Sequence, residues 1–212
     1  VVPGNGGIRS DVFYPPKEPV KEPIIINPRG FRAYVNNEAY FKAIPLVLAK
    51  RSDAKFIFTS MAEKSQALEW MKELKIEHAV QLNPQLSQAQ MAEVFRGAQI
   101  VVSPAIHDGT PNTLIEAMAC GTPVIAFRRG SVPEVMEHGV TGFIVDTVDE
   151  AVAAAHHIQT LDRARVRQRF EQRFTVERMA RDYVDTYRRN EGLEARTLPV
   201  SGVTEVASHV AA

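Results

Sequence analysis

Two acidic residues, Asp108 and Glu116, flank a segment that could bind a phosphorylated ligand. Gly109 in this segment has no side chain, so a ligand can approach its backbone closely. Pro111 stands at the expected first position of a helix over residues 111–120. Proline is tolerated there because the N–H that it lacks would have no partner within the helix. The pattern predicts a short helix whose N-terminus follows an open loop.

The N-terminus of that helix has the chemistry of an anion site. Unpaired N–H groups, expected on Asn112, Thr113 and Leu114, favour a phosphate together with the positive end of the helix dipole. Carboxylates repel phosphate, so Asp108 and Glu116 are expected to accept hydrogen bonds from neutral hydroxyl groups. A ligand with phosphate at one end and hydroxyls beside it is a sugar nucleotide.

The elements around these residues form a strand, loop, helix and strand. A β-branched run over residues 99–103 ends at Pro104, and the run PVIAF follows Gly121, so both runs predict buried strands. Gly121 is placed to end the helix as a left-handed cap. The polar arc of the helix is formed by Asn112, Thr113, Glu116 and Cys120. This arc is expected to face a cleft beyond the strand ends.

The spacing of Asp108, seven residues and Glu116, followed by AMACGTPVIA, resembles the signature of retaining GT-B glycosyltransferases of family 4, also called glycosyl transferases group 1. The resemblance implies the C-terminal, donor-binding domain of such an enzyme. It places Asp108 at the transferred sugar and Glu116 at the ribose hydroxyls. The predicted phosphate-binding segment consists of Gly109, Thr110, Pro111, Asn112, Thr113 and Leu114. The first acid is more often Glu in this family.

Arg29 and Arg32 follow another predicted strand, over residues 23–27, and are candidates for the diphosphate. Members of the family commonly have Gly-Arg here and a Lys five or six residues later. Arg29 matches the first of these, the Lys is absent, and only Arg32 could supply its charge. The planar fork of arginine suits phosphate. Arg29 and Arg32 would stabilise the leaving diphosphate while Asp108 orients the sugar; the alternative is that both arginines are solvated loop charges.

The resemblance further implies that the nucleotide base runs along the loop after the predicted strand 78–82. Leu82 and Asn83 are therefore the expected base contacts. The donor would be a UDP- or GDP-linked sugar, and its transfer would require no metal or other cofactor. The acceptor would be a sugar, a lipid or a small molecule.

The whole chain alternates five or six strand signals with helices. This order predicts an α/β fold with a doubly wound, mostly parallel Rossmann-like sheet in three α/β/α layers. The fingerprint Gly-x-Gly-x-x-Gly is missing, so NAD is not an expected ligand. Residues 1–23 are interpreted as an interdomain linker, residues 24–190 as the nucleotide-sugar-binding domain and residues 191–212 as a disordered tail. The acceptor half would then be missing from this chain.

Composition narrows the class of protein. The 212 residues contain 25 basic and 25 acidic side chains, which gives no argument for nucleic acid as a partner. No apolar run approaches the ~18 to 20 residues needed to cross a bilayer, and no secretory leader is visible. The single Cys120 fits a reducing, cytoplasmic compartment and is expected to fill space rather than act as a nucleophile.

Further local signals predict where helices begin and which faces they bury. Asn37 is expected to cap a helix, and Leu68 to point inward from the next one. Capping boxes are expected at Ser87 with Gln90, Ser131 with Glu134, and Thr147 with Glu150. Arg128 and Arg129 are expected to face water. The arginine-rich segment 162–173 predicts a helix with a solvated cationic face, and a membrane-surface role is less favoured.

Two alternatives to a transferase stay open at this point. One is a nucleotide-sugar-binding module without turnover, because the acceptor half is expected to be absent. The other is a GT-B nucleotide-sugar epimerase, which also keeps two acids near the sugar. The epimerase needs a catalytic histidine, and His107 is the candidate in place, although a role in shaping the Asp108 turn is the simpler interpretation.

Overall fold

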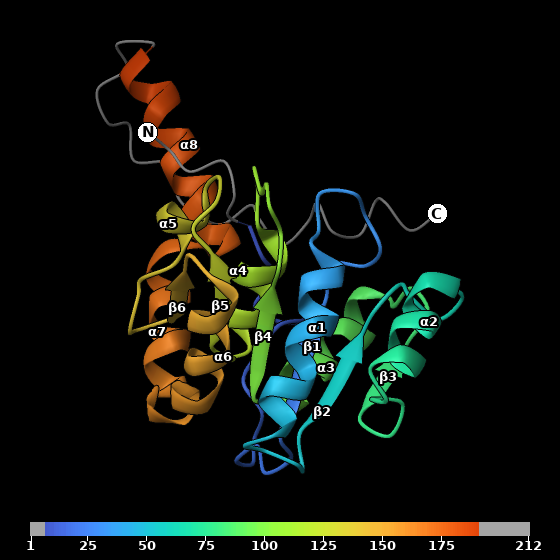
Figure 1. Cartoon of the computed structure of the whole chain (residues 1–212). Coiled ribbons are helices and arrows are strands. Elements are labelled where there is room, and N and C mark those ends of the chain that lie inside the picture. Colours follow the sequence, from blue (N-terminus) through green and yellow to red (C-terminus); the bar gives the residue numbers. More distant parts are fainter. Residues whose placement is uncertain (1–6, 191–212) are drawn as a thin grey trace, which may run out of the picture.

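Six parallel strands form one sheet in the order β3-β2-β1-β4-β5-β6 in the computed structural model, which describes residues 7–190 (Figure 1). The strands are β1 (Ile24–Asn27), β2 (Lys55–Phe58), β3 (Val80–Leu82), β4 (Ile100–Ser103), β5 (Val124–Phe127) and β6 (Gly142–Val145). The strand order reverses between β1 and β4, which pair directly at Ile25 with Ile100 and at Ile26 with Val101, and the chain crosses to the second half of the sheet after β3. The predicted doubly wound parallel sheet is confirmed.

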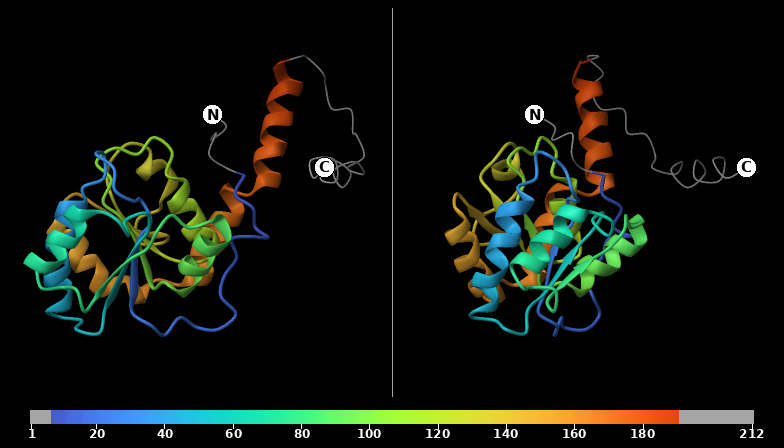
Figure 2. Two further views of the ribbon diagram at one scale, coloured as in Figure 1. Left: turned by 90° about the vertical axis from the view of Figure 1, so that its right-hand side faces the viewer. Right: turned by 45° about the vertical axis from the view of Figure 1, so that its right-hand side comes forward.

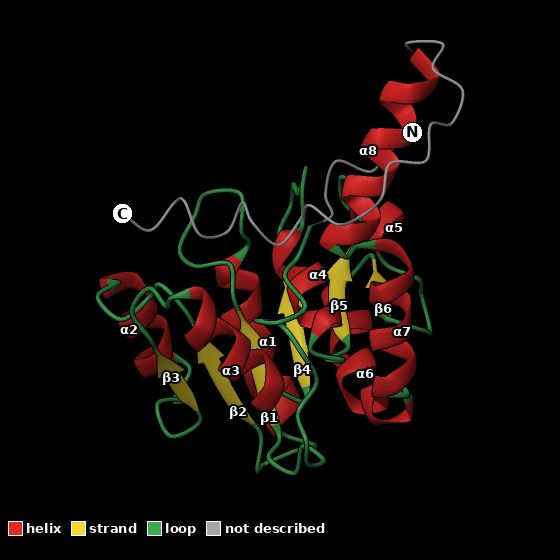
Figure 3. Ribbon diagram, turned by 180° about the vertical axis from the view of Figure 1, so that it is seen from behind, coloured by secondary structure: helices red, strands yellow, loops and turns green. Residues whose placement is uncertain are grey.

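Helices cover both faces of the sheet, so the fold has the three predicted layers (Figure 3). The helices are α1 (Asn37–Leu48), α2 (Ser65–Glu73), α3 (Gln88–Gly97), α4 (Asn112–Ala119), α5 (Val132–Val135), α6 (Val148–His157), a 3₁₀ turn (Ile158–Thr160), α7 (Arg163–Arg173) and α8 (Val176–Asn190). One core lies between the sheet and α3, α4 and α7, and the other between the sheet and α1, α2 and α6. The strands are nearly all apolar because both of their faces are covered.

Aromatic side chains pack both cores. Phe41 on α1 stacks on Phe58 of β2 with ring centroids 4.5 Å apart. On the other face, Phe13 is 2% exposed and packs against Phe95 of α3, with ring centroids 6.4 Å apart. Part of the segment that precedes β1 therefore belongs to the core.

The arginines of α7 correct the prediction of a solvated cationic face. Arg163 donates to the carbonyl of Ala98 at 3.0 Å and to the hydroxyl of Thr122 at 2.7 Å. Arg167 donates to the carbonyl of Ala119, the last residue of α4. These carbonyls end helices or adjoin strand starts and lack a partner within their own helix, so the guanidinium groups supply one. The face that meets α4 is structural.

Three local predictions at helix starts and faces were wrong. The helix-capping side chain before α1 is Asn36, which accepts from the N–H of Ala39 at 3.3 Å, whereas Asn37 is the first helical residue. Pro111 is the N-cap of α4 rather than its first helical residue. Leu68 is 44% exposed, because Ala67 and Met71 are the residues of α2 that face the sheet.

The predicted capping boxes have three different outcomes. The box of Ser87 and Gln90 is complete. Thr147 accepts from the N–H of Glu150, but the Glu150 carboxylate accepts from Asp146 rather than from Thr147. Ser131 makes no capping hydrogen bond to α5, so that prediction was wrong. Gly121 ends α4 with a φ of +68°, as predicted.

The closing helix α8 projects from the body of the domain (Figure 2). Three of its large apolar side chains, Tyr183, Val184 and Tyr187, are exposed. Residues 1–6 and 191–212, which include the predicted disordered tail, lie outside the described residues. Within residues 7–190, no helix combines the length and apolar character needed to cross a bilayer.

Candidate functional site

Arg29 and Asp108 meet where the strand order reverses. Arg29 follows β1 and Asp108 lies in the loop after β4, and these two strands are neighbours at the centre of the sheet. The Nη2 atom of Arg29 lies 3.4 Å from Oδ2 of Asp108, and its Nη1 atom donates to the hydroxyl of Thr113 at 3.3 Å. Loops beyond the carboxyl ends of strands at such a reversal form the usual ligand crevice of doubly wound sheets. The structure thus brings three predicted site residues together.

Two buried asparagines hold the loop that carries Arg29. The side-chain oxygen of Asn27 accepts from the N–H of Arg29 at 3.0 Å, and its amide donates to Asn37 at 3.2 Å. Asn37 in turn donates to the carbonyl of Gly30 at 3.2 Å. Sequence reasoning missed both residues as site supports, although an asparagine directly after three isoleucines signals a polar group at a buried strand end. This network fixes the direction in which the arginine leaves β1.

The carboxylate of Asp108 is almost completely buried, with 3% of its surface exposed. Burial raises the pKa of Asp108, while the neighbouring Arg29 charge and the N–H of Thr110 oppose that rise. Its Oδ2 atom has no hydrogen-bond partner among residues 7–190 beyond the ion pair with Arg29. The structure pairs this carboxylate with Arg29, and its expected contact with the sugar stays a prediction.

Glu116 lies on the same face of α4 as Thr113, one helical turn further along. Burial raises the pKa of Glu116 to about 7. No described side chain pairs with its carboxyl group, since the hydrogen bonds and ion pairs of residues 7–190 do not include it. A half-buried carboxyl group without a partner lowers the stability of the empty domain. The same group is well suited to accept hydrogen bonds from ligand hydroxyls.

The N–H groups at the start of α4 are only partly free. The N–H of Asn112 donates to the Thr110 carbonyl at 2.8 Å and that of Leu114 to the Pro111 carbonyl at 3.0 Å, so the prediction of free groups was wrong for these two residues. The backbone N–H groups of Gly109 and Thr113 have no partner within the described part of the chain. A methyl group added at Gly109 would meet no atom within 4 Å, so a ligand has room beside it.

Other predicted site residues lie at the same edge of the sheet but apart from this cluster. Arg32 is exposed in the β1–α1 loop and forms no ion pair with residues 7–190. Leu82 ends β3 and Asn83 follows it, two strands away from β1, a separation of roughly 10 Å from the usual strand spacing. Asn83 accepts from Gln81 at 2.8 Å. An extended nucleotide could span from the central cluster to this loop.

His107 and Cys120 differ in exposure, and the expected role of His107 in shaping the Asp108 turn stays a prediction. His107 is exposed beside Asp108, and its side chain forms no hydrogen bond or ion pair with residues 7–190. Cys120 is completely buried, which corrects its predicted place on the polar arc. Burial raises the pKa of its thiol to about 12, so Cys120 fills space and is not a nucleophile. No group of three or more potential metal ligands occurs among the described residues.

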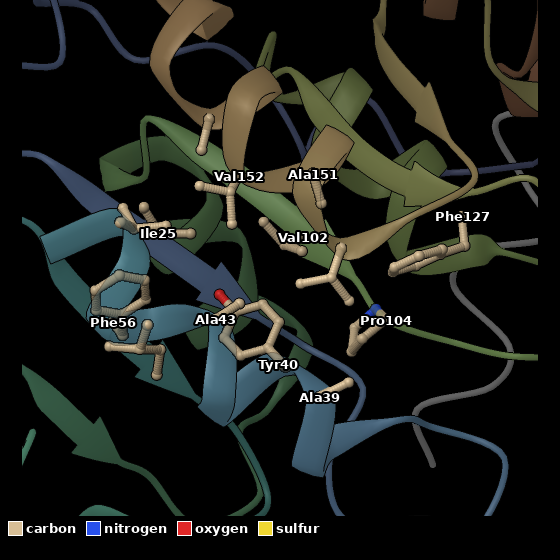
Figure 4. Close-up of a pocket in the computed structure, with 14 residues that line it drawn as sticks. Ile25, Ala39, Tyr40, Ala43, Phe56, Val102, Pro104, Phe127, Ala151 and Val152 are labelled. Carbon is tan, nitrogen blue, oxygen red and sulfur yellow. The ribbon is translucent and has the colours of Figure 1, made fainter. Parts of the chain in front are cut away.

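A separate cavity of about 50 Å³ lies between α1, α6 and the sheet (Figure 4). Side chains such as Ile25, Val102 and Phe127 line it, and its lining carries no charged group. Tyr40 is also part of this lining, and its hydroxyl is buried without a partner among residues 7–190. An apolar cavity of this size cannot hold a nucleotide, so the central loop cluster is the candidate site.

The family model of glycosyl transferases group 1 matches residues 10–175. The chain belongs to this family. The match includes both Arg29 and the segment from Asp108 to Glu116, and the domain has the GT-B fold and matches the C-terminal half of its structural neighbours. The predicted family and the predicted fold are therefore confirmed.

Individual proteins and solved structures are similar to parts of the chain. A D-inositol 3-phosphate glycosyltransferase of Thermobispora bispora is 33% identical over 102 residues, which are 48% of this chain and 24% of that protein. Sucrose-phosphate synthase from Thermosynechococcus elongatus has a TM-score of 0.74 at 22% identity, over 89% of this chain and 52% of that structure. HepE from Anabaena, solved with UDP-glucose, has a TM-score of 0.74 at 14% identity, over 85% and 55%. The chain spans about a quarter of the first relative and half of these structures.

Proposed function

We propose that this chain is the donor-binding domain of a retaining glycosyltransferase that transfers a sugar from a nucleoside diphosphate to an acceptor hydroxyl. The observation that carries the proposal is the meeting of Arg29, Asp108 and Thr113 at the reversal of the strand order, one helical turn from the unpaired Glu116. A cation and free N–H groups suit the diphosphate, and a carboxyl group suits the ribose hydroxyls. Family membership supports the same chemistry.

Transfer breaks the bond between the anomeric carbon and the diphosphate oxygen and forms a bond from that carbon to the acceptor oxygen, whose proton is taken up by the departing diphosphate or by water. Negative charge develops on the departing diphosphate. Arg29 and the free N–H groups of Gly109 and Thr113 would stabilise that charge, because they are held in place before the reaction. Asp108 would hold the Arg29 guanidinium in position. A direct contact between Asp108 and the sugar stays a prediction.

The proposal assigns residues 24–190 to nucleotide-sugar binding and residues 1–23 to a connection with an acceptor half. Leu82 and Asn83 would lie along the base, Glu116 on the ribose, and Arg32 at the rim of the diphosphate site. The solved HepE complex contains UDP-glucose. A UDP-linked donor is therefore the first to test, and a GDP-linked donor the second. The acceptor would be a sugar, a lipid or a small molecule.

Isothermal titration of the chain with UDP, GDP and ADP, and with their glucose conjugates, tests the proposal. We expect one base to bind in the micromolar range and the other two at least tenfold more weakly. A chain that binds none of them more tightly than millimolar would contradict the proposal. Sugar transfer by the chain alone and by the chain fused to an acceptor half then separates an enzyme from a binding module without turnover, because only the enzyme gains activity on fusion.

A further inference from the structure

Ser131 stands in the β5–α5 loop, next to the segment that carries Asp108. Its backbone N–H donates to the carbonyl of Asp108 at 2.9 Å. Its hydroxyl lies 2.9 Å from the carbonyl oxygen of Gly109 and 3.3 Å from that of Asp108. The hydroxyl is therefore used on a neighbouring loop, which explains why α5 has no side-chain cap. Two consecutive carbonyl groups of the candidate site point at one residue.

Gly130 completes the contact between the two loops. Its φ is +55°, a backbone conformation that residues other than glycine rarely adopt. A Cβ atom at this position would lie only 2.1 Å from the carbonyl oxygen of Asp108. A side chain at residue 130 would therefore force the loops apart. The β5–α5 loop fits the backbone of the Asp108 loop closely.

The planar trans peptide links these carbonyl groups to the opposite N–H groups. In each unit the C=O and N–H point in opposite directions, so fixing one fixes the other. The Asp108 carbonyl belongs to the same unit as the N–H of Gly109, and the Gly109 carbonyl to the same unit as that of Thr110. Because both carbonyls face Ser131, both N–H groups face away from it. The N–H of Gly109 has no acceptor among residues 7–190.

We propose that Ser131, with Gly130, is a positioning residue that turns the N–H group of Gly109 toward the donor diphosphate and the N–H group of Thr110 toward the Asp108 carboxylate. The proposal rests on the proposed function for the identity of the ligand. Ser131 itself does not touch the ligand in this account. It acts on the diphosphate alone and not on the nucleoside, since Glu116 and the base loop are held by other elements.

Binding of UDP and of uridine to variants at residue 131 distinguishes this role from a general structural one. Calorimetry measures UDP, and saturation-transfer NMR measures uridine. We expect Ser131→Ala to weaken UDP roughly three- to tenfold and to leave uridine unchanged, because one hydroxyl is lost from the phosphate side only. Ser131→Thr keeps a hydroxyl and should restore UDP binding. Equal weakening of both ligands, or no change for UDP, would overturn the proposal.

Asp162→Ala is the matched control. Asp162 caps α7 with a 2.9 Å hydrogen bond to the N–H of Ala164, near the strand starts and so at the opposite edge of the sheet. It should lower the stability of folding without changing the UDP to uridine ratio. A crystal structure of Ser131→Ala adds a readout without nucleotide, because the 108–109 or 109–110 peptide should rotate. If the wild-type chain binds no nucleotide, the proposed function fails, while unchanged peptides in this structure would overturn the positioning role itself.

Discussion

The guanidinium of Arg29 and the carboxylate of Asp108 lie 3.4 Å apart across the boundary between β1 and β4, although the two residues are far apart in the sequence. Burying such a pair costs desolvation energy, and that cost is recovered only with good geometry and further hydrogen bonds. Here Nε of Arg29 and Oδ2 of Asp108 are both buried without a hydrogen-bond partner in the described chain. A donor diphosphate with its hydroxyl-rich sugar is the kind of ligand that would complete these contacts.

Replacing Arg29 by glutamine should weaken UDP binding about ten- to a hundredfold, because a charge-assisted hydrogen bond contributes roughly 1.5 to 3 kcal/mol. Calorimetric titration at constant ionic strength measures the effect. Arg128→Gln is the control, since Arg128 also follows a strand of this sheet but is exposed and pairs with Asp146 at 3.2 Å. Equal losses in the two variants would mean that the charge of the whole edge, and not Arg29, attracts the ligand.

Glu116 should make the stability of the empty domain depend on pH. Burial raises its pKa from 4.5 to about 7, so the folded state holds this proton more tightly than the unfolded state does. The stabilisation is complete below pH 4.5 and is lost as the pH rises through 7. Glu116→Gln should therefore be more stable than the wild type at pH 8, by on the order of 1 to 3 kcal/mol, and similar to it near pH 4.5. Urea unfolding at both pH values measures the difference.

The control for this measurement is Glu177→Gln, because Glu177 is an exposed residue of α8. Its effect on unfolding should stay within about 0.5 kcal/mol at either pH. If Glu116→Gln destabilises the domain equally at both pH values, this outcome would contradict the structure, in which the Glu116 carboxyl is buried without a partner.

Nucleotide affinity should respond to the same group in the opposite direction. An ionised Glu116 accepts hydrogen bonds from two ribose hydroxyls, whereas the protonated group has less acceptor capacity. The ratio of UDP affinity between the wild type and Glu116→Gln should therefore increase from pH 5.5 to pH 8. The effect of the titration of the UDP phosphate on affinity is the same for both proteins, so it cancels in the ratio. A ratio that stays constant over this range would show that Glu116 does not bind the ribose as an ion.

Local sequence signals located the central unit of the fold well. The strand, loop, helix and strand around Asp108 could be predicted from local signals. Apolar runs mark the strands, and Pro104 and Gly121 mark where a strand and a helix end. Glu116 could be placed on a helix face from its spacing alone. The position of Arg29 beside Asp108 followed only from the family resemblance and from the rule that ligand sites lie at strand ends.

Contacts between distant loops were beyond a local pattern. Ser131 has the spacing of a capping box, yet its hydroxyl bonds to a loop more than twenty residues earlier in the chain. The arginines of α7 have the spacing of a solvated face, but the carbonyl groups they reach are those of Ala98, which directly follows α3, and Ala119, which ends α4. Both errors have one cause, since a polar side chain carries no local information about which backbone group lies opposite it. Asn27 and Asn37 were missed as supports for the same reason.

Arg163→Lys should show that the α7 face holds the domain together. Lysine carries a single ammonium group, so it cannot reproduce both the 3.0 Å bond to Ala98 and the 2.7 Å bond to Thr122. Burial lowers the pKa of Arg163, and a lysine at this position would also pay for desolvation. We expect a loss of roughly 1 to 3 kcal/mol in urea unfolding. Arg165→Lys, at an exposed position of the same helix, should change stability by less than about 0.5 kcal/mol. Similar small effects in both variants would mean that Arg163 is a solvated charge, as the sequence predicted, and does not stabilise the domain.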